Sequence, residues 1–418
     1  MKRVLREAHA HIFQLGRSLS MLELGGCGSA EQMLDAIADR AKTLGEDEWL
    51  LAQGARPQGW DNPSWPGRAQ LDQAGGGRPV VAWCFDYHAM VASSSALTHA
   101  RIDASTTIES GVVELDEAGE PSGLLLEHAA LRMWNSVPEP DDAQRRELVL
   151  AACRHLIGLG FSEVHDLKAQ PWLGTVLSEL LAAGEIDMRF ELFPLVPDLK
   201  ASIEAQRAGF DERVRIAGGK CFVDGTLNSR TAWMLHPYAD GRPEHPSGVA
   251  MMTTKQIDNA LLACKEHGLP LASHAIGDAA VRAVLDAIER NGCERTRCRI
   301  EHAELIDAAD LRRFVELGVI ASLQPCHLLA DMEALRRAVP DRLDRVLPIR
   351  SLLKSGLAPG VDLLFGSDVP IVRADAEDSI QAAIHRRRAG MSESESINPG
   401  EAIDEETAWA CFAPGSES

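Results

Sequence analysis

The stretch Arg6-Glu7-Ala8-His9-Ala10-His11-Ile12, close to the N-terminus, places two histidines at alternate positions of a predicted strand. Alternate residues of a strand point to the same face and lie roughly 6.6–6.8 Å apart along the chain. Two imidazoles at that spacing can close on one metal ion with bonds of about 2 Å. A lone His-x-His proves little, so the interpretation depends on the rest of the chain.

Four further candidate ligands come at long intervals, each near the end of an apolar run. They are Lys220, His274, His302 and Asp368. Each also has an ordinary interpretation: the histidines as core or helix-capping residues, the aspartate as a helix cap, and the lysine in a surface turn after two glycines. Their common position at the ends of apolar runs favours a shared site.

Short apolar runs that end in polar residues alternate with segments of helical pattern, which is typical of βα units. We predict strands at Arg6–Ile12, Ser162–His165, Met188–Leu195, Arg213–Val223, Pro270–His274, Cys298–His302, Val319–Gln324 and Leu363–Ser367. We predict helices at Asp142–Gly158, Leu173–Ala183, Thr254–His267, Ala279–Arg290, Ala308–Leu317 and Ile349–Ser355. Eight strands with helices between most of them favour an α/β fold, namely a (β/α)8 TIM barrel. In that fold the catalytic residues lie at the C-terminal ends of the strands.

Residues 45–140 do not fit one crossover helix after the first strand. They include a loop rich in tryptophan and proline around Trp60 and Trp65, and a turn-rich stretch at 117–123. We therefore predict one barrel over 1–418 with an insertion or lid subdomain at 45–140. Loops on the active face of such folds commonly carry specificity.

Composition narrows the class of partner. The 418 residues carry a formal net charge of −20, with a hydrophobic fraction of 45%. This charge disfavours nucleic acid and anionic membranes as partners. The odd count of nine cysteines, the absence of an apolar leader before His9, and the absence of a stretch of roughly 18–20 apolar residues predict a soluble cytoplasmic protein.

The order of several short motifs adds a family resemblance. Besides the residues above, the chain has Asp224-Gly225, His274-Ala-Ile-Gly-Asp278, Ile300-Glu-His302, Gln324-Pro325 and Gly366-Ser-Asp368. Over nearly its whole length it resembles the amidohydrolase superfamily, most closely the amidohydrolase-3 branch of YtcJ-like proteins and N-substituted formamide deformylases.

The resemblance implies a metal-dependent hydrolase on a TIM barrel. His9 and His11 would hold one ion with Asp368, and His274 and His302 would hold a second. Lys220, if carboxylated, would bridge them. The residues leave open whether one or two ions bind; zinc is the default for such donors, and manganese, iron or cobalt are compatible.

The chain also departs from its relatives. The small β-sandwich that relatives usually carry is expected to be absent or vestigial, and Glu7 stands where aspartate is usual. The Asp-Gly-His of the insertion is Asp86-Tyr87-His88 here. An uncovered face left by a missing sandwich would favour a homodimer.

We expect Asp368 to act as the catalytic base, with His88, Arg230 and His327 contacting the substrate. The expected reaction is hydrolysis of a non-peptide C–N bond in a small molecule, such as an amide, formamide or cyclic amide. Two alternatives stay open: an esterase, lactonase or phosphoesterase on the same scaffold, and a catalytically silent barrel that binds a metal or ligand.

Overall fold

The computed structural model describes residues 4–45, 48–85, 87, 89–108, 111–241 and 243–414. Their contacts divide the chain into two compact units. The large unit comprises Met1–Gly16 and Arg146–Ser418, and the small unit comprises Arg17–Arg145. The predicted insertion, 45–140, falls within the range of the small unit, and its role as a lid stays a prediction.

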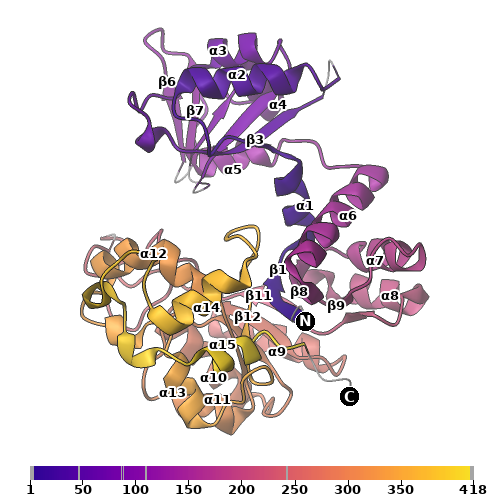
Figure 1. Ribbon diagram of the computed structural model, residues 1–418, viewed down its shortest axis with the longest axis vertical. Coiled ribbons are helices and arrows are strands. Elements are labelled where there is room, and N and C mark those ends of the chain that lie inside the picture. Colours follow the sequence, from indigo (N-terminus) through magenta and orange to yellow (C-terminus); the bar gives the residue numbers. More distant parts are fainter. Residues whose placement is uncertain are drawn as a thin grey trace. The chain divides into compact units, whose positions relative to one another are not determined.

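The large unit contains two parallel sheets (Figure 1). The first has β1 (Leu5–Ala10), β8 (Phe161–Ala169), β9 (Arg189–Pro194) and β10 (Val214–Ile216), in that order. The second has β11 (Gly219–Phe222), β12 (Leu271–Ala275), β13 (Arg299–His302), β14 (Ile320–Leu323) and β15 (Leu363–Phe365). Isolated parallel bridges occur between Ala10 and Val369 and between Leu195 and Lys220. Because all these pairings are parallel, the C-terminal ends of the strands meet at one edge of each sheet.

Every predicted strand has a counterpart, but Arg213–Val223 was wrong as a single strand. The chain there forms β10, which pairs with β9, and then β11, which pairs with β12. The break falls at Ala217-Gly218, where a Cβ on Gly218 would lie 2.6 Å from the carbonyl oxygen of Pro270. The chain thus changes its partner strand where two backbones approach closely.

Helices follow most strands of the large unit. The predicted ones are α6 (Asp142–Leu159), α7 (Leu173–Ala182), α9 (Thr254–Lys265), α10 (Asp278–Arg290), α11 (Leu311–Leu317) and α13 (Ile349–Ser355). Five further helices were not predicted: α1 (Ile12–Ser20), α8 (Leu199–Gly209), α12 (Pro325–Ala338), α14 (Ala376–His385) and α15 (Glu405–Ala410). In α10, Val281, Val284, Leu285 and Ile288 are buried at the three- and four-residue spacing of a helix that covers a sheet.

The small unit is a mixed sheet with helices on both faces. Its strands are β2 (Leu22–Glu23), β3 (Leu50–Ala55), β4 (Val80–Cys84), β5 (Ala89–Ala92), β7 (Pro121–Glu127) and β6 (Gly111–Leu115), in spatial order. Its helices are α2 (Ala30–Ala41), α3 (Arg68–Ala74), α4 (Ser94–Ala100) and α5 (His128–Trp134). Val81 and Trp83 pack with α4 and α5, whereas Val80 and Ala82 pack with α2 and α3. Alternate residues of β4 thus serve two separate apolar clusters.

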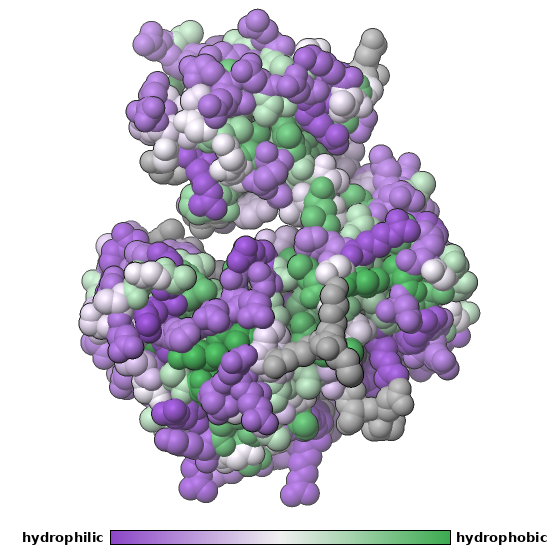
Figure 2. Space-filling view, viewed as in Figure 1, coloured by the Kyte–Doolittle hydropathy of each residue, from purple (hydrophilic) through white to green (hydrophobic). Residues whose placement is uncertain are grey.

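The face of the molecule seen in Figure 2 is mainly polar. Figure 2 shows hydrophilic residues over most of the visible face, with smaller apolar areas between them, as the net charge of −20 leads one to expect. Among the helices that the structure describes, none combines the length and the apolar character needed to cross a bilayer.

Candidate metal centre

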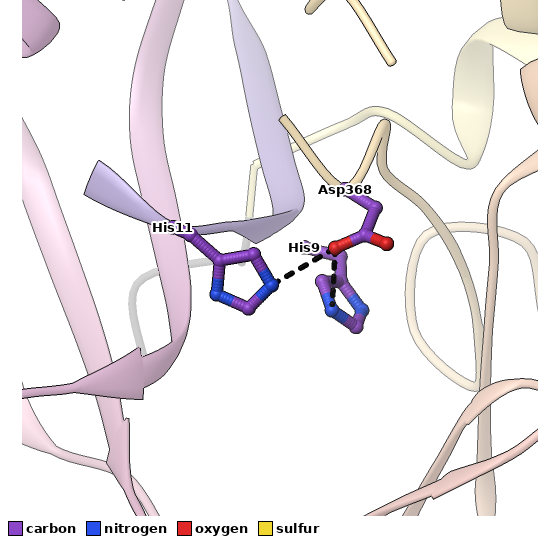
Figure 3. A group of neighbouring side chains, drawn as sticks. All are labelled: His9, His11 and Asp368. Atoms are coloured by element: carbon purple, nitrogen blue, oxygen red, sulfur yellow. Dashed lines mark ion pairs between the residues drawn. The ribbon is translucent and has the colours of Figure 1, made fainter. Parts of the chain in front are cut away.

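The His-x-His pair lies at the C-terminal end of β1, beside the segment that follows β15. His11 Nε2 is 2.9 Å and His9 Nε2 is 3.3 Å from Asp368 Oδ1, so both rings converge on one carboxylate oxygen (Figure 3). Gly366 permits this approach, because a Cβ at that position would lie 2.5 Å from the backbone nitrogen of His9. The three side chains therefore form one group that could hold a cation.

The proton on His9 can be assigned from its second nitrogen. His9 Nδ1 lies 2.8 Å from Glu301 Oε2. An ionised carboxylate only accepts hydrogen bonds, so Nδ1 carries the proton and the lone pair of Nε2 points at Asp368 Oδ1. Oδ1 itself accepts no hydrogen bond despite the two nearby rings. Facing lone pairs at this distance are unfavourable unless a cation lies between them, which fits a metal ligand pair.

Three further predicted ligands lie beside this group. The ring of His302 is 4.8 Å from that of His9 and 4.4 Å from that of His274, measured between centroids. Lys220 on β11 is buried nearby, and its Nζ, like Nδ1 of His302, has no hydrogen-bond partner. Buried polar atoms are nearly always paired in folded proteins. Unpaired atoms of ligand type, gathered in one place, fit a site that a bound group completes.

Backbone strain marks the same place. Asp368 has φ of 64° and His302 has φ of 72°, in the left-handed region that side chains other than glycine rarely adopt. Such conformations cost about 1–3 kcal/mol each and cluster at functional sites. His302 ends β13, and Asp368 lies three residues after the end of β15.

Burial keeps the imidazoles neutral, which is the form that binds metal. It lowers the pKa of His9 to about 4 and that of His274 to about 3. Burial also lowers the pKa of His302 well below its usual value, and the neighbouring histidines lower it further. These three rings can therefore coordinate a cation without first losing protons.

The lysine and the aspartate are shifted in the directions that their predicted roles require. Burial lowers the pKa of Lys220 to about 8, against the opposing charges of Glu301 and Asp368. Burial raises the pKa of Asp368, but His9 and His11 outweigh this and hold it below its usual range. Lys220 thus has access to the neutral amine that carboxylation needs, and Asp368 is ionised as a base must be.

Three acidic residues to which no role was assigned from the sequence form hydrogen bonds with the candidate ligands or with the backbone next to them. Glu301 contacts His9, as described. Glu7 Oε1 accepts hydrogen bonds from the backbone nitrogens of His9 at 3.0 Å and Ser367 at 2.8 Å, tying β1 to the segment after β15. Asp224 accepts from the backbone nitrogens of Trp233, Ile276 and Gly277. Sequence proximity was the available signal, because Glu7 lies two residues before His9 and Glu301 directly before His302.

The three predicted substrate contacts have different surroundings. His327, on α12, lies with Nε2 3.2 Å from the carbonyl oxygen of Ser367 and 4.0 Å from Asp368 Oδ2. Arg230 directs its guanidinium to Asp240 at 2.6 Å and to the carbonyl oxygen of Leu227 at 2.8 Å. His88 lies outside the described residues. The structure thus brings His327 to the ligand group, while Arg230 is engaged with its own loop.

The surroundings of His327 favour its protonated form. Burial alone would lower its pKa, but Glu304, with Oε1 3.5 Å from Nδ1, and the charge of Asp368 raise it to about 9. A protonated imidazole beside the ligand group can donate a hydrogen bond to an oxygen bound there.

Comparisons with known proteins identify the family of this chain. The model described as "Amidohydrolase family" matches residues 5–417. The chain is 27% identical to the putative amidohydrolase YtcJ of Bacillus subtilis (strain 168), covering 98% of this chain and 78% of that protein. It is 24% identical to the N-substituted formamide deformylase of Arthrobacter pascens, covering 89% and 71%.

A solved structure of a metal-dependent hydrolase is also similar to this chain. The uncharacterized metal-dependent hydrolase from Pyrococcus horikoshii superposes with a TM-score of 0.80 at 26% identity, over 97% of this chain and 78% of that one. The resemblance inferred from the motifs is therefore confirmed. The match of the family model over nearly the whole length decides the assignment: this chain belongs to the amidohydrolase family.

Proposed function

We propose that the chain is a metal-dependent hydrolase that cleaves a non-peptide C–N bond in a small molecule, such as an amide, formamide or cyclic amide. One observation carries the proposal: Lys220 Nζ, His302 Nδ1 and Asp368 Oδ1 are buried together without hydrogen-bond partners. The similarity to an N-substituted formamide deformylase supports formamides as the first substrates to try.

We also propose that the strands of the large unit close into a (β/α)8 barrel. The bridge between Ala10 and Val369 supports closure on one side, next to β1, and the bridge between Leu195 and Lys220 supports it on the other, next to β11. In a barrel closed at these points, β1, β8, β9, β11, β12, β13, β14 and β15 would all direct their C-terminal ends to the candidate site.

The donor set fits one or two divalent ions. His9, His11 and Asp368 would hold one, and His274 and His302 a second, with a carboxylated Lys220 between them. Imidazole and carboxylate donors suit zinc, and manganese, iron and cobalt are compatible. When bound, such an ion acidifies a water molecule and polarises a carbonyl group.

The chain's own residues supply the proton transfers. Asp368, ionised at neutral pH, accepts one proton from the attacking water and returns it to the leaving nitrogen, so that an amine and a carboxylic acid result. Protonated His327 donates a hydrogen bond to the oxygen on which negative charge develops. Glu301 and Glu7 hold the ring and the backbone of His9 in place during these steps.

Metal content measured by inductively coupled plasma mass spectrometry tests the site. We expect about one or two equivalents in the protein purified without chelator, and a loss of metal in the double variant His9→Ala/His11→Ala. The matched control is His155→Ala/His267→Ala, which removes two exposed histidines. Metal absent from the wild type after incubation with zinc or manganese would leave the silent barrel as the better description.

A substrate panel tests the reaction. It contains an N-substituted formamide, a cyclic amide, a lactone, an aryl ester and a phosphodiester, each assayed with the metal-loaded protein. We expect turnover of at least one amide that exceeds turnover of the matched ester. Faster ester, lactone or phosphodiester hydrolysis would replace the C–N assignment while keeping the metal site.

A further inference from the structure

A line of buried charged side chains leads from His9 into the interior of the large unit. Glu301 contacts His9 Nδ1 through Oε2 at 2.8 Å and accepts from Arg299 Nε through Oε1 at 2.7 Å. Arg299 Nη1 lies 2.8 Å from His165 Nδ1, and His165 Nε2 lies 3.0 Å from Glu163 Oε1. These five residues, which we call the interior network, are all nearly fully buried.

The chemistry of the donors fixes every proton in the interior network. Arginine has only donors, so His165 Nδ1 accepts from Arg299 and the ring carries its proton on Nε2. Glu301, as a carboxylate, accepts, so His9 carries its proton on Nδ1. The two histidines are therefore held as opposite tautomers, and His9 is left with a free lone pair on Nε2 facing Asp368.

Arg299 is the member that joins the most strands. Besides Glu301 on β13 and His165 on β8, it donates from Nη2 to the carbonyl oxygen of Ala8 on β1 at 2.8 Å and to Ser322 Oγ on β14 at 3.1 Å. Its guanidinium also lies 4.8 Å from the centre of the Phe193 ring. Ala8 directly precedes His9, so one side chain fixes both the backbone of β1 and the carboxylate that holds the His9 ring.

We propose that Arg299 is a positioning residue for the candidate metal centre, which through Glu301 and the carbonyl of Ala8 holds His9 as the Nδ1–H tautomer with Nε2 directed at the metal position. The proposal rests on the proposed function in taking His9 as a ligand. Partners of this kind behind a metal-binding histidine commonly change metal affinity about 10- to 100-fold when they are removed. Without the guanidinium, Glu301 would be a buried carboxylate lacking its counter-ion, and the ring of His9 would lose its fixed acceptor.

The experiment uses the full-length protein labelled with ¹⁵N-histidine. The variants are Arg299→Met, Arg299→Lys and Glu301→Gln, with Arg215→Met as the matched control. Arg215 pairs with Glu191 and has a side chain 67% exposed, so it lies at the outer side of the same cluster of charges. Two quantities are measured: the tautomer of His9 by two-dimensional ¹H–¹⁵N NMR of the metal-free protein, and the zinc dissociation constant by chelator competition.

We expect Arg299→Met and Glu301→Gln each to weaken zinc binding about 10- to 100-fold and to mix the His9 tautomers. Arg299→Lys restores the charge without the forked geometry and should recover part of the affinity. Arg215→Met should leave both quantities unchanged. An unchanged His9 tautomer and zinc affinity in a folded Arg299→Met variant would overturn the proposal.

Two further outcomes are decisive. If Arg299→Met does not fold, Glu301→Gln decides alone, since it preserves the shape of the side chain, and an unchanged tautomer and affinity there would overturn the proposal. If the wild type binds no zinc, the proposed function fails separately. The metal-free tautomer then still tests the positioning, because a His9 ring already protonated on Nε2 would contradict the role of Glu301.

Discussion

Four groups of histidine and carboxylate side chains among the described residues of the large unit bring three ligand-type atoms close together, and two of them contrast with each other. One is His9, His11 and Asp368, and the other is Glu163, His165 and Glu191. Composition alone does not distinguish them, because each has the donors that a divalent cation accepts. They differ in what else their atoms contact.

In the second group the charges are already balanced. Both nitrogens of His165 have partners, Glu163 lies 3.9 Å from Arg6 Nη1, and Glu191 pairs with Arg215. In the first group, Asp368 Oδ1 and His11 Nδ1 are buried without hydrogen-bond partners. The contrast indicates that a site for a ligand is marked by the atoms that burial leaves unpaired, whereas a fully paired cluster is a structural one.

The largest effect is expected from Asp368→Asn. Asparagine keeps the shape of the side chain but cannot accept the proton from water, so kcat should fall about 10²- to 10⁴-fold. The melting temperature should stay close to that of the wild type. Steady-state kinetics and calorimetry measure both, with Asp258→Asn, which breaks a surface pair with Arg290, as the control. Activity equal to that of the wild type would remove Asp368 as the base.

Glu163→Ala should instead damage the fold while sparing the metal. The substitution removes one buried carboxylate partner from both Arg6 and His165, and removing one member of a buried charge pair costs up to about 3–5 kcal/mol. Urea denaturation of the metal-free protein measures this loss, and mass spectrometry measures the metal.

His11→Ala is the counterpart variant. It should lose metal, but its unfolding free energy should fall by only about 1 kcal/mol or less, because His11 Nδ1 makes no hydrogen bond. If His11→Ala proved the more destabilising, the contrast between the groups would fail.

Acid should lower the stability that Glu191 contributes to the folded protein through the cluster of Glu163, His165 and Glu191. Burial raises the pKa of Glu191, but His165 and Arg215 outweigh it and lower the pKa to about 2 from 4.5. A carboxyl group with a depressed pKa in the folded state adds stability above its unfolded pKa and loses it as pH falls toward about 2. The contribution is about 3 kcal/mol at most, at about 1.4 kcal/mol per pKa unit. We expect urea denaturation at several pH values between about 6 and 3 to show that the difference in unfolding free energy between wild type and Glu191→Gln shrinks in acid. A difference that stays constant over this range would contradict the prediction.

The smallest effect is expected from Arg230→Gln. Its pair with Asp240 has side chains 12% and 40% exposed, so its loss should cost about 1 kcal/mol or less. Because the guanidinium is already engaged by Asp240, we expect KM to change less than about twofold. His327→Gln is the comparison variant and should lower kcat, since it removes a cation beside Asp368. A large rise in KM for Arg230→Gln would restore Arg230 as a substrate contact.

Much of the candidate site could be predicted because its residues end strands. His9, His274, His302 and Asp368 each follow a short apolar run, and in a parallel α/β fold the C-terminal ends of strands meet. The interior network could not be predicted in this way. Arg299 and His165 are 134 residues apart, and only the order of β1, β8, β13 and β14 in the two sheets brings their side chains into contact.

The position at which the small unit begins could not be read from a local sequence pattern either. The change of partner between β10 and β11 depends on a backbone contact with Pro270, which leaves no local pattern. The small unit begins at Arg17, well before the predicted insertion, because α2 and β2 pack into its sheet rather than into the large unit.

The α/β class could be inferred from the sequence because hydrophobic periodicity is a local property of a chain, and the family could be inferred from the order of short motifs, whereas the candidate ligands stay predictions. Which buried polar atoms are paired is a property of the folded chain. Three arginines reach Glu163, His165 and Glu191, whereas Lys220, His302 and Asp368 each keep a buried atom without a hydrogen-bond partner. Pairing depends on which strands lie side by side, and that is settled only when the whole chain has folded.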